Sequence, residues 1–273
     1  MRLFVSAVIL FTAAAAALCA EDAPRPATAE EIAIFKAAVR DSIPDTEHWA
    51  YTETTRRKFG KGAPKGDTIV RFDPSLPYPD QFKPLQIDGK PPTEKQLKSY
   101  RQRGEKRGER VAKAAEAARN PTYMPPPAQL RIGGTDVTPD LEHPLVVRAD
   151  EARVVFEVRV ESKNKDIPVD KFQVLVTVSR PACLIENVTF RVRESFRVKL
   201  IAKVKEGEAS LDFTVVDPKF GPVLTSQTGD GSGSLLFVPV SGEFARKRTD
   251  WKRVKSYDER FQVRLAPMQF LED

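Results

Sequence analysis

The chain has 273 residues, of which 41% are hydrophobic and 30% charged, with a mean hydropathy of −0.39. This composition is that of a folded, water-soluble protein and excludes a disordered or mainly membrane-embedded chain, and the length allows one large domain or two small ones. The formal net charge is +6, and the two cysteines are Cys19 and Cys183.

The N-terminus has the pattern of a secretory signal peptide. Met1 and Arg2 precede an apolar run over residues 3–18, and small residues continue to Ala20 before an acidic pair. We therefore predict a signal peptide over residues 1–20, no internal disulfide in the mature chain, and a periplasmic or secreted location. A membrane anchor and a lipid-modified Cys19 are the alternatives, although the run lacks a basic stop and Leu18 stands where a lipoprotein signal needs a small residue.

A first helix is predicted over residues 28–43. Thr28 and Glu31 have the spacing of a capping box, and Pro44 ends the segment. Apolar residues three and four positions apart form one stripe, which needs a flat partner to cover it. The stripe consists of Ile32, Phe35, Val39 and Ile43.

Residues 48–59 and 67–73 alternate between apolar and polar, which predicts a long antiparallel hairpin around the turn at 60–66. Prolines hold the following segment as an extended loop, and Asp88-Gly89 indicates a tight turn.

A basic helix is predicted from Thr93 to Arg119, where nine basic residues stand against four acidic ones. Gly104 and Gly108 lie on its thin apolar stripe, and close approach to another backbone is one reason for glycine at such positions. The charged face is either a solvated surface or a contact site for an acidic partner or membrane surface. For the contact site, the candidate residues are Lys106, Arg107 and Arg110.

A proline-rich break at residues 120–128 separates this helix from a region of strands. Apolar alternation predicts strands at 153–161, 172–178, 188–192, 198–204, 211–215, 235–240 and 261–265, with a turn at Glu206-Gly207. The glycine-rich segment 228–234 lacks the lysine of a phosphate-binding loop and opens no helix, so we interpret it as a mobile hairpin loop.

Seven or more strands, each with one polar face, predict an antiparallel sheet with one side buried, and two helices are available to cover that side. The predicted class is therefore α+β, with a curved antiparallel β-sheet, or half-open barrel, and helices packed on the concave face.

The sequence contains no constellation typical of catalysis. It has two histidines, His48 and His143, no CxxC, no acidic cluster at ligand spacing and no GxSxG motif. The basic helix carries no interleaved aromatic residue except Tyr100, which disfavours nucleic-acid binding. We expect a protein that is not an enzyme and that needs no cofactor or metal.

Two stretches carry a resemblance to a known family. The first combines a Trp-x-Tyr strand from Trp49, a return strand ending VRFDPSLP and a loop reading LQIDGKPPT before a helix. The second is FRVRESFRVKLIAKVKEGEASLDFTVVD, followed by Gly-Pro-Val-Leu. Together they resemble uncharacterised secreted bacterial proteins similar to the outer-membrane lipoprotein carrier (LolA-like) superfamily, over residues 28–265.

The resemblance implies one LolA-like domain over residues 21–273, made of a helix, hairpin and basic helix (21–119), the break (120–128) and a β-meander (129–273). It implies a periplasmic carrier that holds a lipid or the acyl chains of a lipoprotein in an apolar cavity. The alternative is an interaction or envelope-sensor module, like anti-sigma regulators of the same fold, acting through the basic helix 94–119. The implied cavity residues, each with an alternative role as ordinary core, are Trp49, Tyr51, Val70, Phe72, Phe156, Val158, Phe190 and Phe213.

Overall fold

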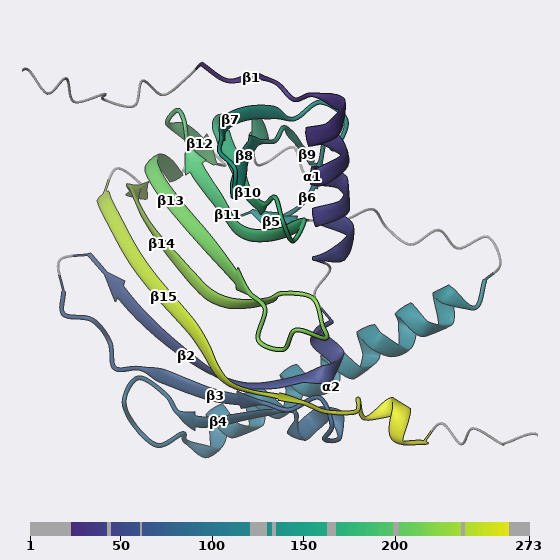
Figure 1. Cartoon of the computed structure of the whole chain (residues 1–273). Helices are drawn as coiled ribbons and strands as arrows, with labels where there is room; N and C mark the ends of the chain where they lie inside the picture. Colours follow the sequence, from purple (N-terminus) through teal and green to yellow (C-terminus); the bar gives the residue numbers. More distant parts are fainter. Residues whose placement is uncertain are drawn as a thin grey trace, which may run out of the picture.

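The computed structural model describes residues 23–42, 45–60, 62–120, 130–132, 135–162, 168–198, 202–235 and 238–261. The fold is α+β and mostly antiparallel, as predicted, with two long helices and strands that bend along their length (Figure 1). The predicted signal peptide, Cys19, residues 121–128 of the proline-rich break and residues 262–265 of the last predicted strand lie outside the described residues.

Twelve strands form the main sheet, in the spatial order β1-β7-β8-β10-β11-β13-β14-β15-β2-β3-β4, with β12 paired to β13. All described pairings are antiparallel. The strands are β1 (Arg25–Pro26), β2 (Trp49–Phe59), β3 (Thr68–Phe72), β4 (Phe82–Gln86), β7 (Leu145–Ala149), β8 (Arg153–Glu157), β10 (Phe172–Ser179), β11 (Leu184–Val192), β12 (Phe196–Val198), β13 (Ala202–Thr214), β14 (Val223–Leu235) and β15 (Val238–Arg253).

A second sheet has three strands in the order β5-β6-β9. Its members are β5 (Leu130–Ile132), β6 (Thr135–Pro139) and β9 (Val160–Ser162). The helices are α1 (Ala29–Asp41) and α2 (Glu94–Ala118), with short 3-10 turns η1 (Thr46–His48), η2 (Tyr78–Asp80), η3 (Val169–Lys171) and η4 (Asp258–Phe261).

Both helices contact the same face of the main sheet, at opposite ends of it. Directly paired residues of neighbouring antiparallel strands point to one side. A line of such pairs runs from Phe156 in β8 through Val176, Val188, Leu211, Gln227 and Arg246 to Thr55 in β2. Tyr51 alternates with Thr55 along β2 and pairs with Phe72 in β3. Phe156 and Phe72 therefore mark one face, here termed the helix-bearing face.

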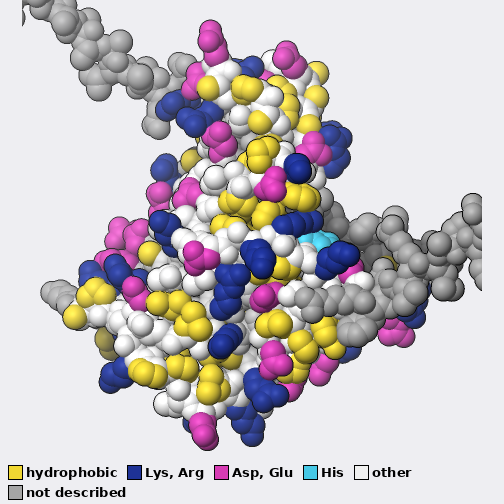
Figure 2. All heavy atoms as spheres, turned by 60° about the horizontal axis from the view of Figure 1, so that its bottom comes forward, with side chains coloured by type: hydrophobic (Ala, Val, Ile, Leu, Met, Phe, Trp, Pro, Cys, Tyr) yellow, Lys and Arg dark blue, Asp and Glu magenta, His cyan; other side chains and the backbone are white. Residues whose placement is uncertain are grey.

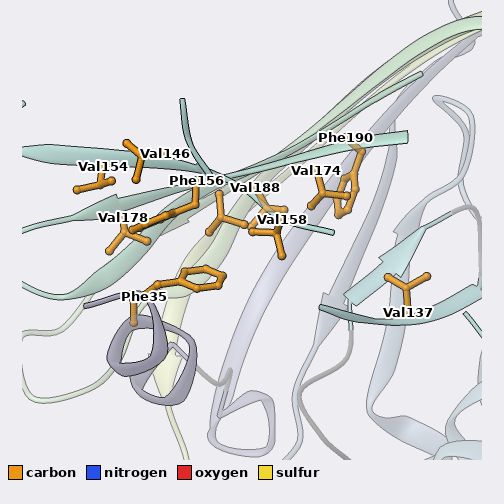
Figure 3. Packing of buried hydrophobic residues seen from close by; sticks show 12 residues of the cluster. Phe35, Val137, Val146, Val154, Phe156, Val158, Val174, Val178, Val188 and Phe190 are labelled. Atoms are coloured by element: carbon orange, nitrogen blue, oxygen red, sulfur yellow. The ribbon is translucent and has the colours of Figure 1, made fainter. Parts of the chain in front are cut away.

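Helix α1 covers the β8–β11 end of this face. The Thr28 hydroxyl caps the helix by accepting a hydrogen bond from the amide of Glu31, and the capping box is complete. Phe35 and Ala38 are fully buried, and the Phe35 ring lies 4.9 Å from that of Phe156 between their centroids (Figure 3). Valines from β7, β8, β10 and β11 surround the two rings and form the main hydrophobic core.

Helix α2 covers the β3–β4 end. Its N-cap is Thr93, the residue at which the predicted basic helix begins, with a capping box to Gln96. Gly104 is buried against η2, and a Cβ on Gly108 would stand 2.7 Å from the Tyr78 ring. The predicted close approach to another backbone is therefore present at Gly104, whereas Gly108 lies against a side-chain ring.

Several predictions about the strands are wrong. Residues 82–86 of the predicted extended loop form β4, which pairs with β3. The predicted strand 198–204 belongs to two strands, because Val198 ends β12 and its pairing partner Ala202 begins β13. The predicted strand 235–240 is likewise divided, because Leu235 ends β14 and its partner Val238 begins β15.

Residues 228–234 lie within β14 rather than in a mobile loop, because each of their amides has a paired strand on both sides. The predicted turn at Glu206-Gly207 is absent, because both residues pair with β14 within the continuous strand β13, just after a bulge between Val204 and Glu206. Residues 153–161 do not form one strand, since the chain passes from β8 to β9 in the second sheet.

Candidate binding groove

The middle of the helix-bearing face is left open between the two helices. A groove of about 460 Å³ lies there, over β10, β11, β13, β14 and β15. It is called the open groove below. Its lining consists of Phe172, Phe190, Val192, Gly207, Glu208, Ala209, Leu211, Gln227, Gly229, Asp230, Gly242, Phe244 and Arg246.

The eight cavity residues implied by the family resemblance fall into two separate groups. Phe156, Val158 and Phe190 belong to the core beneath α1, and the partly buried Phe213 packs against it. Trp49, Tyr51, Val70 and Phe72 lie in β2 and β3, at the other end of the sheet. Of the eight, Phe190 alone also lines the open groove.

The β2–β4 end of the face is filled by alternating aromatic rings and arginines, here termed the aromatic–arginine cluster. The Arg107 guanidinium lies 5.2 Å from the centre of the Phe72 ring, and Arg253 lies 4.1 Å from that of Phe220. These side chains stack on one another and fill this end of the face. The protein's own side chains therefore take the place of a cavity here. The cluster consists of Trp49, Tyr51, Phe72, Phe82, Phe220 and Trp251 with Arg103, Arg107, Arg248 and Arg253.

A row of three glycines crosses the floor of the open groove. Gly207 in β13 pairs with Gly231 in β14, which pairs with Gly242 in β15. Phe59 follows Gly242 in the same row, and a Cβ on Gly242 would lie 3.5 Å from its ring. Glycine weakens a central strand and marks positions where a ligand or another backbone approaches closely. The glycine row therefore forms a side-chain-free channel that runs across the strands.

Exposed hydrophobic side chains border this channel. Phe244 is 40% exposed, and its ring leans across β14 so far that a Cβ on Gly229 would lie 2.5 Å from it. Beyond the glycine row, Val240 and Val238 continue the same face of β15 and are 47% and 62% exposed, and Phe59 is 64% exposed. Single exposed apolar residues are common, but four on one face beside a groove mark a surface suited to an apolar ligand.

The end of the groove toward the aromatic–arginine cluster is polar. Arg246 donates a hydrogen bond from Nη1 to Oε1 of Gln227 (2.8 Å), and its Nε lies 3.4 Å from Oε1 of Glu53. Arg248 donates from Nε to the other oxygen of Glu53, at 3.0 Å, and its guanidinium lies 4.7 Å from the centre of the Tyr51 ring. One carboxylate is thus shared by two guanidinium groups. Burial is the main reason that the pKa of Tyr51 is raised here.

The opposite face of the sheet has a different character. A hollow of about 460 Å³ also lies there, but charged side chains line it, among them Arg56, Lys58 and Glu243. On the side of the molecule that Figure 2 turns forward, hydrophobic, basic and acidic groups are likewise interspersed. A hollow walled by charges that are hydrated offers little to an apolar ligand, so the open groove is the better candidate site.

The three predicted contact residues of the basic helix do not share one environment. Lys106 and Arg110 are exposed. The Arg107 side chain is 12% exposed, pairs with Glu47 and donates a hydrogen bond to Gln81. Arg107 therefore holds α2 to η1 and η2. The exposed positive charges beside it on α2 are those of Lys106 and Arg110.

No group of three or more potential metal ligands is found among the described residues. No helix in the described ranges has the length and apolar character needed to cross a membrane.

Sequence reasoning missed most of the groove. Phe172 and Leu211 were visible as members of alternating strands, but nothing in the sequence showed that α1 and α2 would leave them uncovered. The alternation of glycine at 229, 231 and 233 with polar residues was the one available signal, because period two is the strand period.

No protein-family model matches the sequence, and no curated protein matches it. Among solved structures, the crystal structure of a LolA superfamily protein from Nitrosomonas europaea is similar, with 11% sequence identity, covering 85% of this chain and 96% of that chain at a TM-score of 0.36.

Proposed function

We propose that this protein is a binding or carrier protein, without enzymatic activity, that holds a lipid or the acyl chain of a lipidated protein in the open groove. The observation that carries the proposal is the glycine row, flanked by Phe244 and Val240 on a face that both helices leave open. The predicted signal peptide would deliver it to the periplasm or outside the cell.

Burial of acyl methylenes would drive binding. Each methylene removed from water contributes about 0.8 kcal/mol, and the side-chain-free floor lets a chain lie against backbone atoms over several strands. Neighbouring strands are about 4.8 Å apart, so the path from Val192 in β11 to Phe59 in β2 spans roughly 19 Å. A half-open barrel whose concave side is the helix-bearing face would shield such a chain from water on both flanks.

The first test asks for a ligand. Lipid should be recovered by mass spectrometry from an organic extract of protein isolated from its native envelope, and purified protein should take up a fluorescent fatty-acid probe. A protein that contains no lipid and takes up no probe would contradict the carrier proposal.

The second test asks for the place of binding. Gly242→Leu should weaken probe binding, because its Cβ fits at 3.5 Å from Phe59 while the rest of the side chain fills the channel. Ser241→Leu adds the same side chain one residue away, at an exposed position on the opposite face, and should leave binding unchanged. Equal effects of the two variants would place the ligand elsewhere.

A second candidate function is contact of the basic helix with an acidic protein or an anionic membrane surface. The exposed positions of Lys106 and Arg110 favour it. Reversing both charges to glutamate should abolish co-sedimentation with anionic vesicles or recovery of a partner, whereas unchanged recovery would count against this function.

A further inference from the structure

The open groove has a charged end and an apolar end, and this polarity bears on the class of ligand. The deduction below rests on the proposed carrier function. Along the helix-bearing side of β15, Arg248 and Arg246 come first, Phe244 follows, and Gly242 and Val240 lie beyond. A ligand that occupies the whole groove therefore meets guanidinium groups at one end and glycine and apolar side chains at the other.

The charges at the polar end are unbalanced. Within the described residues, the ion pairs of both Arg246 and Arg248 go to Glu53, so the three side chains together carry one excess positive charge. Their side chains are 30%, 16% and 15% exposed. A net charge in a partly dehydrated site costs free energy that a bound anion would offset.

Arg246 has donors to spare. A guanidinium carries five N–H donors. Within the described part of the chain those of Arg246 make one hydrogen bond, to Gln227. Its Nε is buried beside Glu53 and makes no hydrogen bond there, so its remaining donors are on Nη1 and Nη2. Planar guanidinium groups bind carboxylate and phosphate oxygens in pairs, which makes Arg246 suited to the headgroup of an anionic amphiphile.

We infer that the ligand is a single-chain amphiphile with an anionic headgroup, a carboxylate or a phosphate, which Arg246 binds while the chain extends past Phe244 onto the glycine row. The Gln227 amide holds the guanidinium in place from β14. Glu53 and Arg248 stay paired, which leaves Arg246 as the group that meets the headgroup.

The test compares three ligands with the same chain: palmitate, palmitoyl lysophosphatidate and the uncharged palmityl alcohol, each measured by displacement of the neutral dye Nile red. At least one anion should bind the unaltered protein tenfold or more tightly than the alcohol, which is about 1.4 kcal/mol. The preferred anion identifies the headgroup as carboxylate or phosphate.

Two variants test the headgroup contact, and a third is their matched control. Arg246→Gln should remove the preference for the anion, so that the anion and the alcohol bind with similar affinity. Lys247→Gln removes the same charge from the adjacent residue, which faces the other side of the sheet, and should keep the preference. Gln227→Glu should also abolish the preference, because a carboxylate on β14 would neutralise Arg246 without removing it; this variant decides the matter if Arg246→Gln fails to fold.

Three outcomes would overturn the inference. The alcohol binds as tightly as both anions, or Lys247→Gln acts as strongly as Arg246→Gln, or folded Arg246→Gln and Gln227→Glu both keep the preference. In each of these cases the carrier proposal survives. If none of the three ligands binds, the carrier proposal falls together with the inference.

Discussion

Gly104 of α2 and Tyr78 of η2 meet backbone to backbone. A Cβ on Gly104 would overlap the carbonyl oxygen of Tyr78 and stand 3.1 Å from Cα of Pro79. Glycine in the middle of a helix costs about 1 kcal/mol relative to alanine, and here the cost allows α2 to lie directly on the loop that precedes β4.

Gly104→Ala should therefore destabilise the protein although alanine is the better helix former. Overpacking of this kind costs about 1–3 kcal/mol, which urea unfolding would measure. Tyr78→Ala should not rescue the variant because the overlap is with backbone. At Gly108 the overlap is with the Tyr78 ring, so the same second substitution should partly rescue Gly108→Ala. If Tyr78→Ala rescued Gly104→Ala as well as it rescued Gly108→Ala, the backbone contact of Gly104 would be contradicted.

Arg107→Ala should lower the free energy of unfolding by about 1.5–3 kcal/mol, the range for hydrogen bonds to charged groups. The change removes the pair with Glu47 and leaves the amide oxygen of Gln81, a residue 1% exposed, without its donor. The adjacent, exposed Lys106 supplies the control: Lys106→Ala should stay within about 0.5 kcal/mol of the unaltered protein. Similar losses of stability in the two variants would mean that the contacts of Arg107 with Glu47 and Gln81 do not stabilise the fold.

Stability should depend on pH through Glu31. The hydrogen bond from Arg25 lowers the pKa of its carboxyl from 4.5 to about 2, against the opposing effect of burial and with help from the amide of Thr28. Because the folded-state pKa is the lower one, this stabilisation is complete above pH 4.5 and is lost as the pH falls toward 2.

Glu31→Gln should therefore cost about 1–3 kcal/mol near neutral pH, with the difference vanishing as the pH approaches the folded-state pKa. Glu30→Gln, at the exposed neighbour in the same helical turn, should cost far less. Denaturation curves at several pH values would measure both, and a pH-independent cost at Glu31 would count against the role of its charge.

His48 should act with the opposite sign. Burial lowers its pKa, but hydrogen bonds to Asp45 (2.5 Å) and Glu259 (2.7 Å) outweigh it and raise the pKa above 6.5. Its stabilisation is complete below pH 6.5 and is lost as the pH rises through the folded-state pKa. His48→Gln should thus be most destabilising at acidic pH. His143→Gln, whose side chain is 80% exposed, is the control, and the same pH profile in both variants would refute the assignment.

Some features of the site were predictable because they depend on local sequence. The capping box at Thr28, the start of α2 at Thr93 and the strand alternation from Trp49 follow from side chains within a few positions of one another. Segment 228–234 was misjudged for the same reason, since local rules assign glycine to turns, whereas pairing on both sides holds this segment as a strand.

By itself, the sequence determined the α+β class, the two helices and the strands that have an apolar side, because propensity, capping and periodicity are local. Only the tertiary structure decided which apolar residues were covered. Phe156 and Phe72 face the same way, but α1 and α2 bury the two ends of that face and leave Phe244 and the glycine row open between them. Where a helix lands on a sheet depends on contacts between segments far apart in the chain, and no local pattern records them.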